Sequence, residues 1–404
     1  MYSARHERMK YGDIKLYTGT SCPELAGRIA THMGLDLCDR EIVQFPNENL
    51  FVQLHSSVRG QDCYAIQTTA APVHRNLMEL LILIQTLRLD SAARVTAVIP
   101  YLCYARSDKK DQPRIPITAR LVADMIEVAG ADRYMFLDLH AGQIQGFFSI
   151  PGDVLTAFYI LIDYLKAKKA SMHKPVVVTA DLGFAKKARN FAVSMDVPLA
   201  FIEKRRVSND SKAQALTMIG DVRDRDVVIV DDEVDTGGSM IQAVNLAKES
   251  GARNVYMVFV HPVFSSNAAD RLAALPVTEF ITTDTIPIPP EKLVKFGRKM
   301  TILSIAQLVY NNHLNGDWKR QHFYRPSPEK LARGALYEWN FDLVHNFRSI
   351  NAGVGKIDLT GAFEKFPVPT LILEGLWDLT WNTDKPGILA KNHPGAKLVL
   401  FENA

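Results

Sequence analysis

The sequence lacks the features that mark a secreted or membrane-bound chain. Its four cysteines are scattered without a C-x-x-C pair, so we expect free thiols in a reducing compartment rather than disulfides or a metal finger. The N-terminus, MYSARHERMK, has no apolar core of a signal peptide. The longest apolar stretch, residues 77–85, is interrupted by Glu79 and Gln85 and is too short to span a bilayer. These absences predict a cytoplasmic protein with no membrane partner.

An excess of charge of one sign is also missing. Lys and Arg number 47 against 44 Asp and Glu, a formal net charge of +3. Nothing global therefore indicates nucleic-acid binding, and any basic site must be local. The 47% of hydrophobic and 23% of charged residues are ordinary for a globular protein, and 404 residues are enough for two or three domains.

Apolar, β-branched runs alternate with amphipathic stretches up to about residue 309. Because the runs are almost continuously apolar, they predict strands of a parallel sheet that is covered on both faces. Two helical patterns, 118–129 and 239–250, end at Gly130 and Gly251, which suit a left-handed C-cap. The predicted fold class is α/β. The predicted strands include residues 94–100, 175–179, 226–231 and 254–260.

The chain contains two similar segments that indicate an internal repeat. VAGADRYMFLDLH (128–140) and ESGARNVYMVFVH (249–261) each read as a helix end, a glycine, a strand and a histidine. We predict two tandem α/β domains, residues 1–155 and 156–309, related by duplication. The remaining segment, residues 310–404, differs in composition, because its start is rich in polar and aromatic residues.

The strongest local signal is VVIVDDEVDTGGS, residues 227–239. A buried strand ends in two acids, a glycine loop follows, and a helix opens at Ser239. Ligands bind beyond the carboxyl ends of parallel strands, and backbone N–H groups at a helix N-terminus hold phosphate. Asp231 and Asp232 are then expected beside sugar hydroxyls or a metal ion. The alternative is an ordinary loop and helix cap with incidental acids.

This stretch resembles the phosphoribosyl-diphosphate motif of type I phosphoribosyltransferases and ribose-phosphate pyrophosphokinases. Three further stretches resemble the pyrophosphokinases alone: YARSDKKD (104–111) their ATP loop, DLHAGQIQGFFSIPGD (138–153) their signature, and EKRR (203–206) their flexible catalytic loop. The resemblance covers about residues 12–309. It implies two tandem phosphoribosyltransferase-like domains with parallel sheets, followed by a partial α/β extension.

The resemblance also implies an activity. The family transfers the β,γ-pyrophosphoryl group of ATP to the C1 hydroxyl of ribose 5-phosphate, giving 5-phosphoribosyl 1-diphosphate and AMP. The resemblance implies that Lys204 and Arg206 are catalytic. Because they alternate on an extended segment, both side chains are expected on the same side of that segment. The basic residues of the ATP loop can neutralise a triphosphate. The implied ATP-binding residues are Phe45, Asn47, Arg106, Asp108, Lys109 and His140.

The second substrate and the metal follow from the same resemblance. Mg²⁺ is the implied cofactor, held at His140 and Asp181, the latter an acid at a strand end. The family forms homo-oligomers, often hexamers, and phosphate or nucleotide regulation is implied near Ser57 and Arg59. The implied ribose-5-phosphate residues are Asp231, Asp232, Asp235, Thr236, Gly237, Gly238 and Ser239.

Several positions depart from the family pattern. Phe184 stands where a second glycine is usual, and a phenylalanine cannot copy a glycine's close backbone approach or positive φ. These changes bear on ATP affinity and activity and leave the ribose-phosphate site intact. The other departures are Asn49 for Glu, Ser107 for Gln, Ser149 for Asp and Gly152 for an apolar residue.

The C-terminal segment resembles part of an α/β-hydrolase of the proline-iminopeptidase type. Residues 369–378 look like the strand that carries that family's acidic triad member, at Asp378, and strand character returns at 397–404. No G-x-S-x-G nucleophile elbow occurs in the chain. We therefore predict a fused fragment without catalysis of its own.

Two other functions remain open. A non-catalytic regulatory subunit of a pyrophosphokinase complex is favoured by Asn49 and Phe184 and opposed by the retained Lys204, Arg206 and His140. A phosphoribosyltransferase that consumes the diphosphate is opposed by the ATP loop and the duplicated domain.

Overall fold

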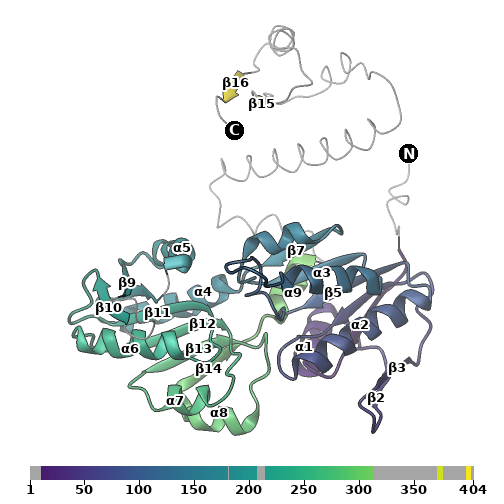
Figure 1. Ribbon diagram of the computed structural model, residues 1–404, viewed down its shortest axis with the longest axis horizontal. Helices are drawn as coiled ribbons and strands as arrows, with labels where there is room; N and C mark the ends of the chain where they lie inside the picture. The colour runs from purple at the N-terminus through teal and green to yellow at the C-terminus, as the bar shows by residue number, and fades with distance from the viewer. Residues whose placement is uncertain (1–10, 181, 207–213, 314–370, 376–396, 402–404) are drawn as a thin grey trace. The chain divides into compact units, whose positions relative to one another are not determined.

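The computed structural model describes residues 11–180, 182–206, 214–313, 371–375 and 397–401 (Figure 1). The chain forms two compact units, residues 1–325 and 326–404. The first unit contains two large, mainly parallel sheets with helices packed against them, which confirms the predicted α/β class.

The N-terminal sheet has five parallel strands in the order β1-β4-β5-β6-β7. Every residue of β4 is buried, as expected for a strand covered on both faces. The strands are β1 (Ile14–Thr18), β4 (Asp62–Ile66), β5 (Arg94–Ile99), β6 (Arg133–Leu137) and β7 (Gly152–Leu155). Its helices are α1 (Pro23–Met33), α2 (Val73–Leu89), α3 (Thr118–Ala129) and the short 3₁₀ helix η1 (Gly142–Phe147).

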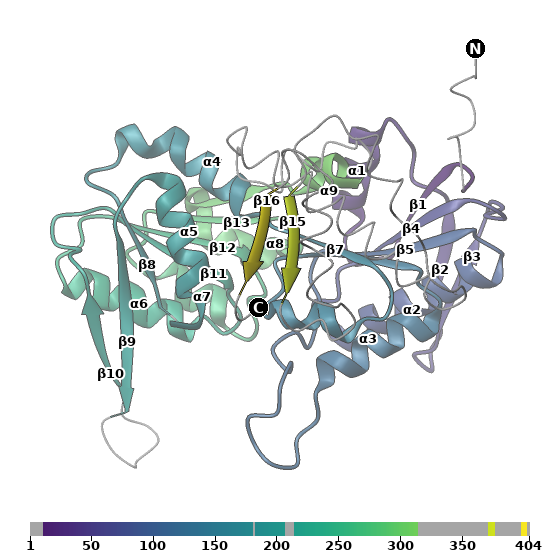
Figure 2. The same ribbon diagram turned by 90° about the horizontal axis from the view of Figure 1, so that it is seen from above.

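A separate antiparallel hairpin, β2 (Arg40–Gln44) and β3 (Leu50–Leu54), branches from this half. It projects away from the C-terminal half in Figures 1 and 2. Its turn contains two of the residues that the sequence assigns to ATP, Phe45 and Asn47.

The C-terminal sheet has seven strands in the order β10-β9-β8-β11-β12-β13-β14, and β10 alone runs antiparallel to its neighbour. The order of the parallel strands reverses between β8 and β11. Such a switch point opens a crevice at the carboxyl ends of the two strands, where ligands of open α/β sheets bind. The strands are β8 (Val176–Thr179), β9 (Leu199–Arg206), β10 (Gln214–Ile219), β11 (Val227–Glu233), β12 (Val255–His261), β13 (Glu279–Thr283) and β14 (Met300–Leu303).

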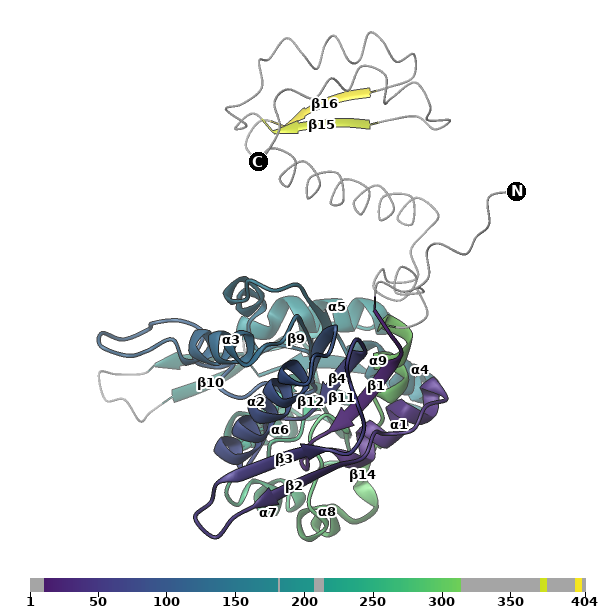
Figure 3. The same ribbon diagram turned by 90° about the vertical axis from the view of Figure 1, so that its right-hand side faces the viewer.

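The helices of this half connect its strands, and the last one returns to the N-terminal half. Helix α9 (Ala306–His313) packs on α1, with the rings of His32 and Tyr310 at 6.3 Å, and the two helices lie close together in Figure 3. The other helices are α4 (Phe158–Lys168), η2 (Lys169–Ser171), η3 (Leu182–Phe184), α5 (Ala185–Met195), α6 (Gly238–Glu249), α7 (Ala268–Ala273), α8 (Pro290–Phe296) and η4 (Gly297–Lys299).

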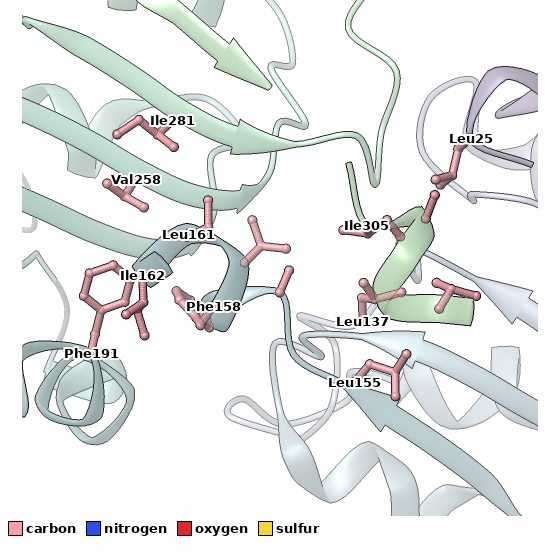
Figure 4. Close-up of a cluster of buried hydrophobic side chains, with 14 of the residues drawn as sticks. Leu25, Leu137, Leu155, Phe158, Leu161, Ile162, Phe191, Val258, Ile281 and Ile305 are labelled. Carbon is pink, nitrogen blue, oxygen red and sulfur yellow. The ribbon is translucent and has the colours of Figure 1, made fainter. Parts of the chain in front are cut away.

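One hydrophobic core is shared by the two halves. Figure 4 shows Leu25 and Leu137 from the N-terminal half near Ile305, the residue before α9, while Leu161 of α4 faces Val258 of β12. Fully burying one such side chain stabilises a fold by about 1.5–3 kcal/mol, so the shared core fixes the position of the two sheets relative to each other. The relative position of the sheets decides which loops of the two halves meet.

The repeat predicted from the sequence is visible as two helix–glycine–strand units. Gly130 and Gly251 end α3 and α6 with φ of +110° and +89°, the left-handed conformation that favours glycine. The two sheets nevertheless differ in order, because the first two parallel strands of the C-terminal half are exchanged relative to the N-terminal half. The predicted domain boundary near residue 155 stays a prediction.

The second unit contributes one described pair of parallel strands, β15 (Leu371–Gly375) and β16 (Lys397–Phe401), drawn side by side in Figures 2 and 3. Strands were predicted at both places. Asp378 lies outside the described residues, and the hydrolase resemblance stays a prediction.

The cysteines match the expectation of free thiols. Burial raises the pKa of Cys22 to about 11, so this thiol is protonated and inert at neutral pH. No helix in the described part of the chain is long and apolar enough to cross a membrane. The free cysteines are Cys22, Cys38, Cys63 and Cys103.

The departure at Gly152 is explained by a neighbouring aromatic ring. A Cβ added to Gly152 would lie 2.1 Å from Cε2 of Tyr134, so the tyrosine ring already fills that space. The ring packs on Phe136 and Phe148, with centroids at 4.7 and 4.2 Å. The absent side chain and the bulky neighbour therefore compensate each other in volume.

We expect Gly152→Val to destabilise the protein by about 1–3 kcal/mol, because overpacking forces the Tyr134 ring out of position. The double variant with Tyr134→Val should recover most of the lost stability, since total volume is then restored. Thermal unfolding of the parent, both single variants and the double variant measures this. A Gly152→Val protein as stable as the parent would show that the ring yields freely.

Candidate active site

The acidic end of β11 lies at the switch point of the C-terminal sheet. Asp231, Asp232 and Glu233 are its last residues, and each of the first two carboxylates accepts the backbone N–H of the next residue at 2.9 Å. These bonds fix the carboxylates at the edge of the sheet where ligands bind. The strand–acid–loop–helix pattern expected from the sequence is present.

The loop that follows leads directly into α6. Gly237 has φ +75° and precedes the first residue of the helix, Gly238, and its carbonyl accepts the N–H of Ile241 at 2.9 Å. A Cβ at Gly237 would also lie 3.2 Å from Leu272, so the conformation requires glycine and the space beside it is tight. Thr236 and Ser239 flank the glycines at this helix N-terminus, where backbone N–H groups and the helix dipole favour an anion.

His140 brings the N-terminal half into contact with these acids. Its Nδ1 lies 3.1 Å from Oδ2 of Asp232, a side chain with only 8% of its surface exposed. The hydrogen bond to Asp232 raises the pKa of His140, against its partial burial. Burial raises the pKa of Asp232, but the bond from His140 and the charge of Lys187 outweigh it and lower that pKa overall. The pair is thus held toward the charged state.

Arg106 makes the second contact between the halves. Its guanidinium Nη1 lies 3.2 Å from Oδ2 of Asp235, and Nε lies 3.3 Å from Oε1 of Glu233. Because 60% of the Arg106 side chain is exposed, it can also receive a phosphate. Four predicted residues from two halves, Arg106, His140, Asp232 and Asp235, therefore gather at one edge.

The rest of the ATP loop is anchored at its base. Asp108 is buried and accepts a hydrogen bond from Nε2 of Gln143 in η1, so it orders the loop, while Lys109 is exposed. Ser107, one of the departures, accepts the N–H of Thr118 at 3.4 Å through its hydroxyl, at the first residue of α3. The serine thus ties the loop to the start of that helix.

Among the described residues, no contact joins Phe45 or Asn47 to the residues at this edge of the sheet. Phe45 is 47% exposed and its ring packs against Phe51 of the same hairpin, at 6.3 Å between centroids. Asn47 accepts the N–H of Asn49 at 3.2 Å and so closes its own turn. Their assignment to ATP stays a prediction.

The two residues predicted to be catalytic, Lys204 and Arg206, lie on β9, whose backbone is described up to Arg206. Positions 204 and 206 pair with Leu216 and Gln214 of β10 and share one face of the strand, with position 205 on the other. The side chains of Lys204 and Arg206 lie outside the described residues, as does Asp181, which follows β8. Their predicted roles stay predictions.

Lys187 of α5 belongs to the site, although the sequence analysis did not select it. Its Nζ donates to the carbonyl of Leu139 at 3.2 Å and lies 4.0 Å from Oδ2 of Asp232. In the sequence it is one of several cations in KKARN, a pattern typical of a solvated helix face. Only the packing of α5 against β8 and β9, which brings its side chain to Leu139 and Asp232, distinguishes it.

Phe184 does not occupy a glycine's conformation in this chain. Its φ is −88°, and its ring is buried against Phe158 at 5.6 Å between centroids. The backbone at Phe184 thus does not take a glycine's positive φ, as predicted for a phenylalanine. The ring fills core between α4 and α5, and Nζ of Lys187 lies 5.5 Å from its centroid. The predicted effect of Phe184 on ATP affinity stays a prediction.

We expect Phe184→Gly to lower stability by about 3–5 kcal/mol through the cavity it leaves, without raising activity. Thermal unfolding and steady-state kinetics with varied ATP measure the two effects. A variant with a clearly lower KM for ATP would show that Phe184 does obstruct the nucleotide.

A magnesium ion is compatible with the carboxylates of this edge. Mg²⁺ binds one or two protein carboxylates and completes its octahedron with phosphate oxygens and water. Asp232, whose lowered pKa keeps it ionised, and the neighbouring Asp231 supply this type of ligand.

Comparison with known proteins identifies the family. A family model described as the N-terminal domain of ribose phosphate pyrophosphokinase matches residues 14–130, and one described as the phosphoribosyl synthetase-associated domain matches residues 206–313. The ribose-phosphate pyrophosphokinase of Caldanaerobacter subterraneus subsp. tengcongensis is 44% identical over 295 residues, covering 73% of this chain and 92% of the relative. The chain belongs to the ribose-phosphate pyrophosphokinase family.

Other relatives of this family agree. Ribose-phosphate pyrophosphokinase 1, chloroplastic, of Arabidopsis thaliana is 44% identical over 297 residues, covering 73% of each chain. The crystal structure of phosphoribosylpyrophosphate synthetase from Mycobacterium smegmatis superposes with a TM-score of 0.70 at 40% identity, covering 74% of this chain and 97% of that one. The family resemblance and the α/β fold predicted from the sequence are thereby confirmed.

Proposed function

We propose that this ribose-phosphate pyrophosphokinase transfers the β,γ-pyrophosphoryl group of ATP to the C1 hydroxyl of ribose 5-phosphate, producing 5-phosphoribosyl 1-diphosphate and AMP for nucleotide biosynthesis. The contact of His140 with Asp232 carries the proposal, because it joins the family's ATP-side histidine to the sugar-side acids. A reaction between two bound substrates needs both sides in one site.

In the proposed arrangement, ribose 5-phosphate lies at the end of β11. Its 5-phosphate binds the N–H groups and hydroxyls of residues 235–239, and its lower hydroxyls approach Asp231 and Asp232. ATP lies between His140 and the Arg106 loop. The C1 hydroxyl oxygen attacks the β-phosphorus in line and gives up its proton to solvent, the bond from that phosphorus to the bridging oxygen of the α-phosphate breaks, and AMP departs with both electrons of that bond.

Charge neutralisation is the main catalytic requirement of such a transfer. Lys204 and Arg206, at the end of β9, are proposed to meet the developing charge, and Arg106 with Lys109 to hold the phosphates. Asp231, Asp232, His140 and Asp181 are the residues proposed to hold Mg²⁺, which neutralises phosphate charge when bound. The pairing of Lys187 with Asp232 keeps the carboxylate ionised and in place.

A discontinuous assay tests this proposal directly. ATP, Mg²⁺ and ribose 5-phosphate are incubated with the full chain, and AMP and phosphoribosyl diphosphate are quantified together. Equimolar formation of the two, lost in Asp231→Ala, is the expected result. No product despite measurable ribose-5-phosphate binding would overturn the catalytic proposal and leave the non-catalytic regulatory subunit as the function.

Assembly and location are proposed on the family resemblance alone. We expect homo-oligomers, with hexamers built from dimers, in the cytoplasm, with no nucleic acid or membrane bound. Sedimentation of the full chain measures the assembly. The C-terminal residues 310–404 are proposed to take no part in the chemistry.

A further inference from the structure

Each residue of a short segment of the N-terminal half, Asp138–His140, makes a contact with the C-terminal half. Beyond the bond between His140 and Asp232, the carbonyl of Leu139 accepts Nζ of Lys187 at 3.2 Å. The carbonyl of Asp138 lies 3.3 Å from Nε2 of His261. Three consecutive residues are thus held by three separate elements, α5, β11 and β12.

His261 is built into the core in one orientation. It is 3% exposed at the end of β12, and its Nδ1 lies 3.0 Å from Oγ1 of Thr285. A carbonyl can only accept, so Nε2 carries the hydrogen and donates to Asp138, and Nδ1 accepts from the threonine hydroxyl. Burial lowers the pKa of His261 to about 4, so the ring is neutral at pH 7.

The residue that His261 contacts has a constrained backbone. Asp138 has φ +39°, which is uncommon for a residue with a side chain. Its carboxylate accepts the hydroxyl of Thr156 at 2.7 Å and the N–H of Ala157 at 2.6 Å. The carboxylate and the carbonyl together hold the turn that leaves β6 and aims His140.

His261 also contacts the second ATP-side loop. The ring of Tyr101 meets it edge-on at 5.1 Å between centroids. Tyr101 follows β5 and starts the segment that contains Arg106. One buried side chain of the C-terminal half therefore contacts the two N-terminal segments that carry Arg106 and His140.

We propose that His261 is a positioning residue of the active site, which orients His140 and the start of the Arg106 loop through the carbonyl of Asp138 and the ring of Tyr101. It does not touch either substrate. The inference rests on the proposed function and deepens it, because it assigns the alignment of the nucleotide side to a residue of the ribose-phosphate half.

The test compares His261→Leu, which removes the donor at similar volume, with His261→Gln, whose amide N–H can replace Nε2–H. His261→Leu is expected to lower kcat about a hundredfold, the typical cost of a 1 Å misplacement, with KM for ribose 5-phosphate within about threefold of the parent. His261→Gln should recover at least about tenfold of this loss. His173→Leu is the matched control, since His173 bonds Asp224 at 3.0 Å before β8, at the opposite edge of the sheet.

Binding measured by calorimetry separates positioning from a merely structural role. His261→Leu should bind magnesium α,β-methylene-ATP about tenfold more weakly and ribose 5-phosphate almost unchanged. Equal weakening of both ligands, or neither ligand affected in a folded variant, would overturn the inference. If the parent makes no product, the proposed function fails while this binding comparison still decides the role of His261.

A second variant covers the case in which His261→Leu does not fold. Thr285→Val removes the hydroxyl that fixes the imidazole and keeps the volume of a fully buried side chain. It should lower kcat by about tenfold, with nucleotide binding weakened more than ribose-5-phosphate binding. Parent-like kinetics in folded Thr285→Val and His261→Gln proteins, with no preference between the ligands, would contradict the proposal.

Discussion

Replacing Lys204 by alanine is expected to lower kcat about 10²–10³-fold, the usual effect of removing one preorganised donor from a transition state. The cation is proposed to act on the charge that develops as AMP departs. KM for both substrates should stay within about fivefold, because the interaction is made mainly in the transition state. Steady-state kinetics with each substrate varied at saturating levels of the other measure the effect.

The neighbouring position provides a matched control for Lys204. Arg205 lies on the opposite face of β9, so Arg205→Ala removes a cation from the same strand without removing it from the proposed face. It should leave kcat within about threefold, whereas Arg206→Ala should resemble Lys204→Ala. Equal losses at 204 and 205 would show that net charge of the strand matters and that the role assignment is wrong.

Replacing Asp232 by asparagine is expected to lower kcat/KM for ribose 5-phosphate roughly a thousandfold. The substitution keeps the shape but removes the charge opposite His140 and Lys187, and loss of one preorganised electrostatic group in an active site typically costs about 10²–10³-fold in rate. The same carboxylate is proposed to meet the sugar hydroxyls, so both binding and alignment are lost. Kinetics and calorimetric binding of ribose 5-phosphate measure the change.

Asp226, near the start of β11, provides a control that separates an effect on catalysis from an effect on folding. Asp226, one residue before β11, is 1% exposed and its carboxylate accepts the N–H of His173 and Nδ2 of Asn254, each at 2.9 Å. Asp226→Asn should lower the thermal midpoint and leave kcat/KM within about threefold. If Asp232→Asn stays within tenfold of the parent, Asp232 does not hold the sugar.

Neighbouring residues accommodate those departures from the family pattern that the described contacts explain. Gly152 is matched by the Tyr134 ring, and Ser107 ties its loop to α3. Phe184 packs its ring on Phe158 in the core. The effects on activity of Phe184 and of Asn49, in the exposed turn of the hairpin, stay predictions.

The sequence by itself determined the local structure and the chemical types of the site. Periodicity and capping predicted the helix at 118–129 with both of its observed ends, because helix formation depends on near neighbours. The strand–acid–glycine–helix pattern at 227–239 likewise predicted, within a few residues, the strand, loop and helix start that the structure shows. Family motifs then supplied the reaction.

Only the tertiary structure decided which of these groups meet. His140 and Asp232 are 92 residues apart in the chain, and His261 lies 123 residues from Asp138. Their contacts require the strand reversal between β8 and β11 and the core shared by the two sheets. The repeat marks His261 as a histidine at a strand end, and Lys187 has no local signal, but neither pattern tells whether the side chain faces solvent, core or ligand. Packing across the two halves, which no short window of sequence encodes, gives them their roles.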